Sequence, residues 1–340
     1  MKKQRIKWLW RPVSSALRIV MLAVFVGNPS TSLAKDTTGL PNDIASGWGG
    51  GWLKSMANGY RPYGYRIVDE QEGHPVRFGQ KSIRFEVRPG DCGNNGSWDD
   101  CTNDRERHEL SQLNNFQKHG HQNWYAWSIY RPASNPNIFP TITILGQFHQ
   151  KDSGKPFFLF TSNHAALTID NQVPDNRSML ANLIAGQEAM ADKWVDILVD
   201  AKWSHNRDGH FKIYANHELK YDYKGPTLAK GRQSFFKFGV YRSWVSRFAD
   251  SNNGTGPPTQ VVYYDELRKG KSLSEVDRVG IADVQRFLKA RGLYTSLVDG
   301  LWGTGSRRAA NSYLASIGEN PVSDYSIEFW KLVHQKNENQ

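Results

Sequence analysis

The chain has 340 residues, 12 of them tryptophan, and a formal net charge of +10. Residues 1–34 carry six basic residues and no acidic ones, so the rest of the chain has a formal charge of only +4. An excess this small, spread over so many residues, argues against a nucleic-acid partner. It suits an acidic polymer that is reached through a local basic groove.

The first segment, "MKKQRIKWLWRPVSSALRIVMLAVFVGNPSTSLAKD", has a basic start, an apolar run from Ala16 to Val26 and small residues that end at Ala34. This pattern predicts a signal peptide over residues 1–34, with cleavage after Ala34. The apolar run is short for a bilayer span, although an uncleaved anchor stays an alternative. We therefore expect a secreted or periplasmic (cell-envelope) monomer with no membrane attachment after cleavage.

Cys92 and Cys101 are the two cysteines of the chain, and both lie in the polar loop "RPGDCGNNGSWDDCTNDR". Export favours a disulfide between them over two free thiols. The loop region also contains four aspartates: Asp91, Asp99, Asp100 and Asp104. They could bind a structural calcium ion, but a solvated acidic loop is the favoured interpretation, and we expect no cofactor and no metal site.

From Gly47 to Leu267 the sequence consists of short alternating runs separated by Gly, Pro, Asn and Asp, such as "SIRFEVRP", "NWYAWSIYRP" and "KPFFLFTSN". This pattern predicts an all-β domain over residues 35–270, a concanavalin-like antiparallel jelly roll. "YANHELKY" predicts a hairpin with Asn216 and His217 at its turn. "DNRSMLANLIAGQEAMAD" is the best candidate for a local helix or an irregular excursion.

After Lys271 the hydrophobic period changes to that of helices, which predicts a small all-α module of three helices over residues 275–335. Gly292 should end the first helix, and an Asp299-Gly300 turn should precede the second. The first helix should bury Ile281, Val284, Phe287 and Leu288. The second should bury Ala309, Ala310, Tyr313 and Leu314.

The run "QSFFKFGVYRSW" (233–244) alternates like a strand, and successive strand side chains point to opposite faces. One face carries the core residues Phe236, Phe238 and Val240. The other carries Lys237, Gly239, Tyr241 and Ser243. Three more strands should pair an apolar face with a polar one. The polar residues expected there are Arg84, Glu86 and Arg88; Arg105, Arg107, Glu109 and Ser111; and Thr143, Leu145, Gln147 and His149. Four such strands predict a lined groove on one sheet.

A groove of Tyr, His, Arg, Gln and Lys side chains suits β-elimination at a uronic acid. The C5 proton of a uronate becomes removable when the neighbouring carboxylate is neutralised. A tyrosine whose pKa is lowered by cations can transfer the protons, and Lys237 is placed to lower the pKa of Tyr241. Gly239 would leave room for a sugar ring to approach the backbone.

The runs "RHEL" (107–110), "QFH" (147–149) and "FFKFGVYRS" (235–243) resemble the three signature strands of jelly-roll polysaccharide lyases. Alginate lyases of this fold have similar triplets. The Lys-Phe-Gly-x-Tyr-Arg form and "RFEVRPGD" are more similar to the heparin lyase and glucuronan lyase branch. The resemblance covers roughly residues 45–268. Ser111 replaces the second arginine of the alginate-type motif, which weakens alginate as the substrate.

This resemblance implies Tyr241 as the catalytic acid and base, with His149 as a second base or a neutralising group. It implies that Gln147 and Arg107 bind the substrate carboxylate, and that Lys237 lies beside the tyrosine. Further substrate contacts are expected from Arg84, Arg88, Arg105 and Glu109. Arg84 and Arg88 could equally be structural ion-pair partners, and Glu109 could pair with Arg107 instead of substrate. The implied partner is an acidic polysaccharide.

The tail resembles a three-helix peptidoglycan-binding module in "DVQRFLKARGLY" and "VDGLWGTGSRRAANSYL", with Ser296, Leu297 and Ser306 at positions where other residues are common. Peptidoglycan is therefore a second possible partner.

Two other functions stay open. A glycoside hydrolase would need two close carboxylates, for which Asp196 and Asp200 on one strand face are the available pair. A non-catalytic lectin would keep the basic groove but would not need Tyr241. His119 and His121 are expected to be loop residues rather than metal ligands. The tryptophans expected in the core include Trp124, Trp127, Trp203 and Trp244.

Overall fold

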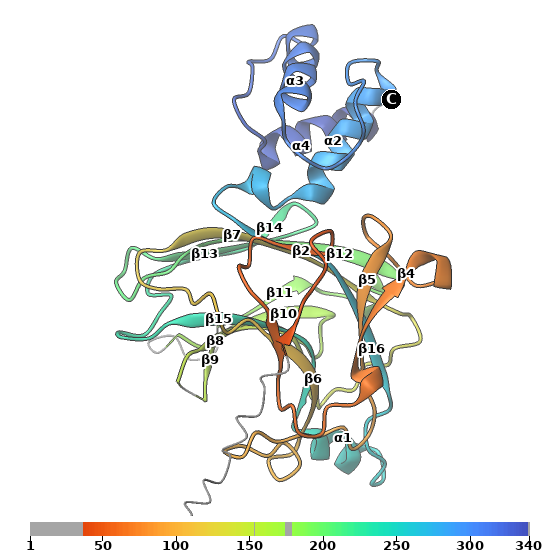
Figure 1. Ribbon diagram of the computed structural model, residues 1–340, viewed down its shortest axis with the longest axis vertical. Helices are drawn as coiled ribbons and strands as arrows, with labels where there is room; N and C mark the ends of the chain where they lie inside the picture. The colour runs from red at the N-terminus through yellow and green to blue at the C-terminus, as the bar shows by residue number, and fades with distance from the viewer. Residues whose placement is uncertain (1–36, 153, 174–178, 339–340) are drawn as a thin grey trace, which may run out of the picture. The chain divides into compact units, whose positions relative to one another are not determined.

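Two antiparallel β-sheets face each other in the computed structural model, which describes residues 37–152, 154–173 and 179–338 (Figure 1). The predicted signal peptide, residues 1–34, lies outside the described residues. None of the helices in the described part of the chain has the length and hydrophobicity needed to cross a bilayer.

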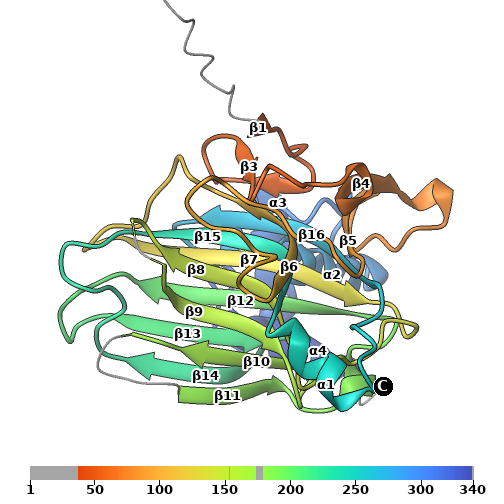
Figure 2. The same cartoon turned by 90° about the horizontal axis from the view of Figure 1, so that it is seen from below.

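The first sheet has eight strands and contains most of the sequence motifs singled out above. In spatial order they are β1 (Thr37–Thr38), β3 (Trp52–Lys54), β6 (Arg105–Ser111), β15 (Ser234–Ser243), β8 (Ile142–Gln150), β9 (Pro156–Ser162), β10 (Leu167–Asn171) and β11 (Met179–Ile184). Figure 2 shows β15, β8, β9, β10 and β11 lying side by side.

The second sheet also has eight strands and carries the helical segment on its outer side. In spatial order they are β14 (Glu218–Lys224), β13 (His210–Ala215), β12 (Lys193–Lys202), β7 (Gln122–Arg131), β16 (Gln260–Gly270), β5 (Lys81–Val87) and β4 (Tyr65–Asp69), with β2 (Ala45–Ser46) paired in parallel to β16. This arrangement confirms the predicted jelly-roll sandwich.

The core between the sheets forms from the apolar face of each strand. Phe236, Phe238 and Val240 of β15 are buried there, as the alternation predicts. Phe85 of β5 packs edge-on against Phe238 across the sandwich, with ring centroids 5.4 Å apart. Such edge-to-face aromatic pairs add to the free energy gained by burial alone.

One strand departs from simple alternation. Leu145 was expected on the polar face of β8 but belongs to the core, together with Phe148. The pairing of β8 shifts register between Ile144 and Gly146, which is the mark of a β-bulge. A bulge adds one residue to the strand and so moves the residues before it to the opposite face.

Two local elements differ from expectation. The segment 175–192 was expected to be a local helix or an irregular excursion, and its described part, 179–192, instead contains the edge strand β11 and a 3-10 turn at Gln187–Ala189. A short helix, α1 (Val245–Ser251), directly follows β15 and was not predicted. The hairpin prediction is confirmed: Asn216 and His217, at the turn between β13 and β14, have φ values of 49° and 63°. Positive φ at both positions is the geometry of the tight turn that suits twisted strands.

Three helices follow the last strand: α2 (Arg278–Ala290), α3 (Thr304–Ser316) and α4 (Ile327–Glu338). The residues predicted to be buried in the first two helices are all buried. Gly292, after α2, and Gly300, before α3, both have positive φ, which glycine adopts at little cost.

The three-helix segment packs against the outer face of the second sheet. Ala126 of β7 and Leu198 of β12 share a hydrophobic cluster with residues of the helices. We call the polar centre of this contact the His217 cluster. It consists of His217 from the β13–β14 turn, Asp277 at the start of α2, Tyr325 before α4, and Trp330 of α4.

The contact at the His217 cluster is close. His217 Nε2 lies 2.7 Å from an Asp277 carboxylate oxygen, which also accepts a hydrogen bond of 2.7 Å from the Tyr325 hydroxyl. Trp330 stacks on the His217 ring with centroids 4.0 Å apart.

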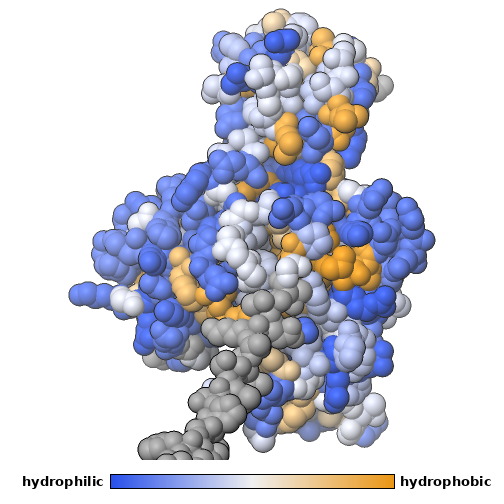
Figure 3. All heavy atoms as spheres, viewed as in Figure 1, coloured by the Kyte–Doolittle hydropathy of each residue, from blue (hydrophilic) through white to orange (hydrophobic). Residues whose placement is uncertain are grey.

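On the face seen in Figure 3, hydrophilic side chains cover most of the surface and apolar ones form separate patches.

Candidate active site

Three neighbouring strands bring the predicted catalytic residues together. β15 lies between β6 and β8 in the first sheet. Tyr241 pairs in register with Arg107 of β6, and Lys237 pairs with Gln147 of β8. Because all of these side chains lie on the face of the sheet opposite the core, they form one continuous polar stripe.

The centre of this stripe is the carboxylate of Glu109, which is 1% exposed. Its oxygens accept contacts from Lys237 Nζ at 2.8 Å, Arg107 Nη1 at 3.1 Å and Gln147 Nε2 at 2.7 Å. Burial alone would raise the pKa of Glu109, but Lys237 and Arg107 outweigh it and hold the pKa below its ordinary value. We call Glu109, these three partners and Asp100 the Glu109 cluster.

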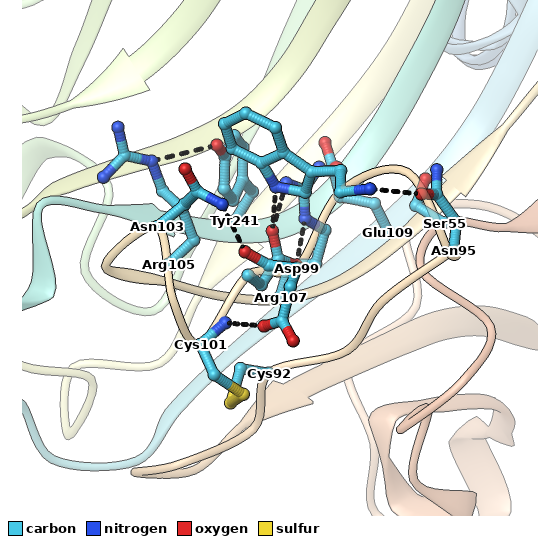
Figure 4. A network of polar contacts seen from close by, with 12 residues as sticks. Ser55, Cys92, Asn95, Asp99, Cys101, Asn103, Arg105, Arg107, Glu109 and Tyr241 are labelled. Atoms are coloured by element: carbon cyan, nitrogen blue, oxygen red, sulfur yellow. Dashed lines mark hydrogen bonds and ion pairs between the residues drawn. A yellow bond between two sulfur atoms is a disulfide. The ribbon is translucent and has the colours of Figure 1, made fainter.

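Asp100 holds the remaining side of Arg107. Its carboxylate accepts two hydrogen bonds of 2.6 Å, from Arg107 Nε and Nη2, and its side chain is fully buried. Asp100 belongs to the loop that the Cys92–Cys101 disulfide closes, which confirms the predicted bond (Figure 4). Asp100 was expected in a solvated acidic loop, with calcium binding as the alternative, and its burial against Arg107 was not predicted. The signal in the sequence is an acid in a cross-linked loop that runs directly into β6.

Tyr241 lies between two arginines. The Arg107 guanidinium carbon is 3.8 Å from the centre of the tyrosine ring, and Arg105 Nε donates a 3.2 Å hydrogen bond to the phenol oxygen (Figure 4). Burial raises the pKa of Tyr241, while Arg107 and Arg105 oppose the rise without reversing it. The expectation that Lys237 lowers this pKa is wrong, because the ammonium group of Lys237 pairs with Glu109 instead.

His149 lies on the other side of the Glu109 cluster, since it is in register with Phe235 of β15. Burial, followed by the nearby charge of Lys237, lowers the pKa of His149 to about 4. The ring is therefore neutral at physiological pH. Its Nδ1 is 2.8 Å from the carbonyl oxygen of Gln150, so Nδ1 carries the proton and Nε2 keeps a free lone pair. His149 can thus accept a proton but does not supply a positive charge.

Gly239 has a role different from the expected one. Its φ is 139°, and a side-chain Cβ at this position would lie 2.4 Å from the carbonyl oxygen of His108 in β6. The glycine is therefore required by the close approach of the neighbouring strand, not by an approaching sugar ring.

The fourth predicted strand is not part of this site. β5 belongs to the second sheet, so the expectation of four polar faces on one sheet is wrong for Arg84 and Arg88. Both arginines instead pair with Glu86 of the same strand, at 2.6 Å and 2.5 Å. Alternation predicts the polar face of a strand but does not say in which sheet the strand lies.

A family comparison covers most of the sandwich. Residues 45–268 match the model of a family described as polysaccharide lyase. The chain belongs to this polysaccharide lyase family.

Solved structures similar to this polysaccharide lyase include three carbohydrate-active enzymes. An endo-β-1,4-glucuronan lyase from the fungus Trichoderma reesei has 16% identity and a TM-score of 0.46, and the match covers 62% of this chain and 89% of that one. An alginate lyase from Pseudomonas aeruginosa has 16% identity, a TM-score of 0.43 and coverage of 65% and 98%. A β-glucanase catalytic domain from Podospora anserina has 13% identity, a TM-score of 0.45 and coverage of 67% and 88%. No curated protein sequence matches the chain.

The carboxylate pair that a hydrolase would need is poorly placed in this polysaccharide lyase. Asp196 and Asp200 lie on β12 of the second sheet, away from Tyr241. They are four positions apart along the strand, or about 13 Å, which is more than the spacing of the two carboxyl groups in glycosidases. Asp196 also pairs with Arg77 at 2.7 Å, and Asp200 lies 3.0 Å from His210.

The acidic loop of the lyase gives no sign of a calcium site. Within the described residues, no group of three or more His, Cys, Asp or Glu side chains could hold a metal ion. The four aspartates have separate protein partners. These are Tyr63 for Asp91, the backbone of Cys101 for Asp99, Arg107 for Asp100 and Ser246 for Asp104.

Proposed function

We propose that this polysaccharide lyase is an exported enzyme that cleaves a uronic-acid polymer by β-elimination on the polar stripe of β6, β15 and β8. The observation that carries the proposal is the contact between the Tyr241 phenol and Arg105 beside the Glu109 cluster. It combines a proton donor with a cation next to a set of fixed charges, which is what elimination at a uronate requires.

In this reaction a base takes the C5 proton of a uronate, and the electrons form a C4–C5 double bond. The bond from C4 to the glycosidic oxygen then breaks, and an acid protonates the departing oxygen. No water is added, and the products are a new chain end and an unsaturated uronate. Neutralising the carboxylate at C5 stabilises the enolate-like intermediate and makes the first step possible.

The two proton transfers fall to different residues in our proposal. His149 is neutral with a free Nε2, so it is suited to take the C5 proton. Tyr241 has a raised pKa and is therefore protonated before reaction, so it is suited to protonate the leaving oxygen. The two residues approach the Glu109 cluster from different sides, and the charges of Arg107 and Glu109 influence both.

Arg105 is the best candidate to neutralise the substrate carboxylate. The family resemblance implies Arg107 and Gln147 for this task, but both already bond to carboxylates of the protein. Arg105 is only half buried, and no described carboxylate pairs with it. Arg107 is then a positioning residue, because it holds Asp100 and Glu109 and stacks on the tyrosine ring.

We favour an unsulfated uronan over heparin as substrate, since a formal charge of +4 is modest for a highly sulfated polymer. The disulfide agrees with an oxidising compartment outside the cytosol. The three-helix segment, by its resemblance to peptidoglycan-binding modules, would keep the enzyme at the cell wall.

The test is near-ultraviolet absorbance of the mature protein mixed with glucuronan, alginate, heparin or hyaluronan. The conjugated C4–C5 double bond absorbs, whereas a hydrolysis product does not. Tyr241→Phe removes the acid and should lower kcat by about 10³-fold with the fold intact. New reducing ends without absorbance would show a hydrolase. Polymer binding with neither signal would support a lectin.

A further inference from the structure

Trp244 is an exposed tryptophan directly after the catalytic strand. Its side chain is 43% exposed, whereas Trp127 and Trp203 are buried in the core as predicted. The prediction that Trp244 is also a core residue is therefore wrong. An exposed aromatic ring next to a reactive group is a common contact surface for sugar rings and cations.

The backbone of Trp244 is held in an unfavourable conformation. Its φ is 65°, in the left-handed region that bulky side chains rarely adopt. Its amide donates to the carbonyl oxygen of Asp104, and its carbonyl accepts from the Thr141 hydroxyl at 2.7 Å. Two other segments thus fix the backbone of Trp244. Backbone strain of this kind is found mainly at functional sites.

Two arginines lie over the indole. The guanidinium carbon of Arg105 is 4.1 Å from the ring centre, and that of Arg247, on α1, is 4.7 Å away. Arg105 also donates a hydrogen bond to the Tyr241 hydroxyl, so one of the two arginines contacts the proposed catalytic residue directly.

Neither arginine pairs with a carboxylate in the part of the chain that the structure describes. Other arginines of the first sheet behave differently: Arg107 pairs with Asp100, and Arg242 pairs with Glu106 at 2.9 Å. Two like charges near the same indole ring repel each other, and a bound anion would reduce this cost. Guanidinium groups match carboxylates in geometry and can bind them through two hydrogen bonds.

We propose that Trp244 and Arg247, together with Arg105, form a binding subsite for the uronate residue next to the one that reacts. This inference rests on the proposed function and names the part of the polymer that the site recognises. The neighbouring uronate places its carboxylate on Arg247, while its ring contacts the indole. Arg105 lies between the two sugars and serves the carboxylate of the reacting one.

The test compares Arg247→Ala and Trp244→Ala in the mature full-length protein, using the polyuronate that gives the strongest absorbance signal. Arg247→Ala should raise KM about tenfold and change kcat by less than about twofold, because the lost contact is made before and during reaction alike. Trp244→Ala should raise KM at least as much, and Trp244→Phe should restore most of the affinity. KM of Arg247→Ala should also depend less on added salt.

Arg286→Ala is the matched control, since Arg286 is an exposed arginine of α2 that pairs with Asp283, and its loss changes the net charge equally. A KM increase equal to that of Arg247→Ala would show that only net charge matters and would overturn the subsite. An unchanged KM in Arg247→Ala and Trp244→Ala would overturn it as well.

Binding without reaction separates this inference from the proposed function. Affinity gel electrophoresis of Tyr241→Phe and Tyr241→Phe/Arg247→Ala through gels with glucuronan or alginate measures it directly. Weaker retardation of the double variant, when the wild type shows no elimination, would support the subsite and reject the proposed reaction. Normal elimination with equal retardation of both variants would reject the subsite alone. No elimination and no retardation would reject both.

Discussion

The Glu109 cluster and the His217 cluster are both built from buried acids and bases on the outer faces of the two sheets, but they differ in what covers them. Asp277 of the His217 cluster is bonded to three groups, and the ring of Trp330 covers His217. All of its partners come from the sheet turn and the helices packed on it. This cluster joins two parts of the fold.

The Glu109 cluster is also satisfied within itself, but its edges are different. At one edge lies His149, neutral with a free ring nitrogen, and at the other lie the Tyr241 phenol and the half-buried Arg105. Buried ion pairs alone therefore do not mark an active site in this molecule. The proposed active site differs in that its buried network holds partly buried groups, which are suited to take a proton, give a proton or bind an anion.

The largest effect is expected from Glu109→Gln. This change leaves Lys237 and Arg107 buried without their shared carboxylate, and breaking a buried pair in this way costs about 3–5 kcal/mol of unfolding free energy. Because Arg107 also supports the ring of Tyr241, kcat should fall at least about tenfold in the remaining folded protein. Urea unfolding and the absorbance assay measure the two effects.

Glu86→Gln is the matched control on the other sheet. Glu86 is also buried between two arginines, but the side chain of Arg88 is half exposed and can be hydrated after the change. We expect a loss of about 1 kcal/mol and an unchanged kcat. Equal losses of kcat in Glu109→Gln and Glu86→Gln would contradict the placement of the active site on the first sheet.

The next largest effect is expected from Asp277→Asn in the His217 cluster. An amide cannot accept hydrogen bonds at its nitrogen, so at least one of the three contacts is lost together with the ion pair to His217. The unfolding free energy should fall by about 2–3 kcal/mol, with kcat unchanged. A fall in kcat as large as that of Glu109→Gln would show that the helices act on the catalytic strands.

The pH dependence of stability sharpens this prediction. Burial alone would lower the pKa of His217, but Asp277 outweighs burial and raises it, with further support from Asp196 and Asp283. Because the pKa of His217 is higher in the folded state, its protonation stabilises the fold. This contribution is complete at pH values below the ordinary histidine pKa and is lost as the pH rises through the folded-state pKa. The wild type should lose stability over that range, and His217→Gln should lose less.

Much of this arrangement could be predicted from local patterns. Alternation identified the core and polar faces of β15 and β6, and helical periodicity identified the buried residues of α2 and α3. The family resemblance implies that the three motifs lie on neighbouring strands, and this was enough to place Arg107, Gln147 and Tyr241 together. These features depend on sequence spacing, and spacing is what the pattern of residues reports.

The predictions that were wrong or missing concern contacts between segments that lie far apart in the sequence. Nothing in "SIRFEVRP" says that β5 pairs with β16 rather than with β6. The ion pair of Asp100 with Arg107 and the exposure of Trp244 depend on how loops return to the sheet. The bulge at Gly146 likewise depends on the register with β9. A pKa depends on the same contacts, which is why the direction for Tyr241 was wrong.

The smallest expected effect is also the one that separates the two proton-transfer schemes. If neutral His149 is the base and protonated Tyr241 the acid, both are in their active forms over the neutral range, since the pKa of His149 is about 4 and that of Tyr241 is raised. A plot of kcat/KM against pH should then be flat between about pH 5 and pH 8. If ionised Tyr241 is the base instead, kcat/KM should rise about tenfold per pH unit through this range. The absorbance of the conjugated product allows kcat/KM to be measured at every pH in one assay. Intrinsic fluorescence at each pH confirms that the protein stays folded. A rising profile that is retained in His149→Gln would exclude His149 as the base and leave Tyr241, held between Arg105 and Arg107, as the group for both transfers.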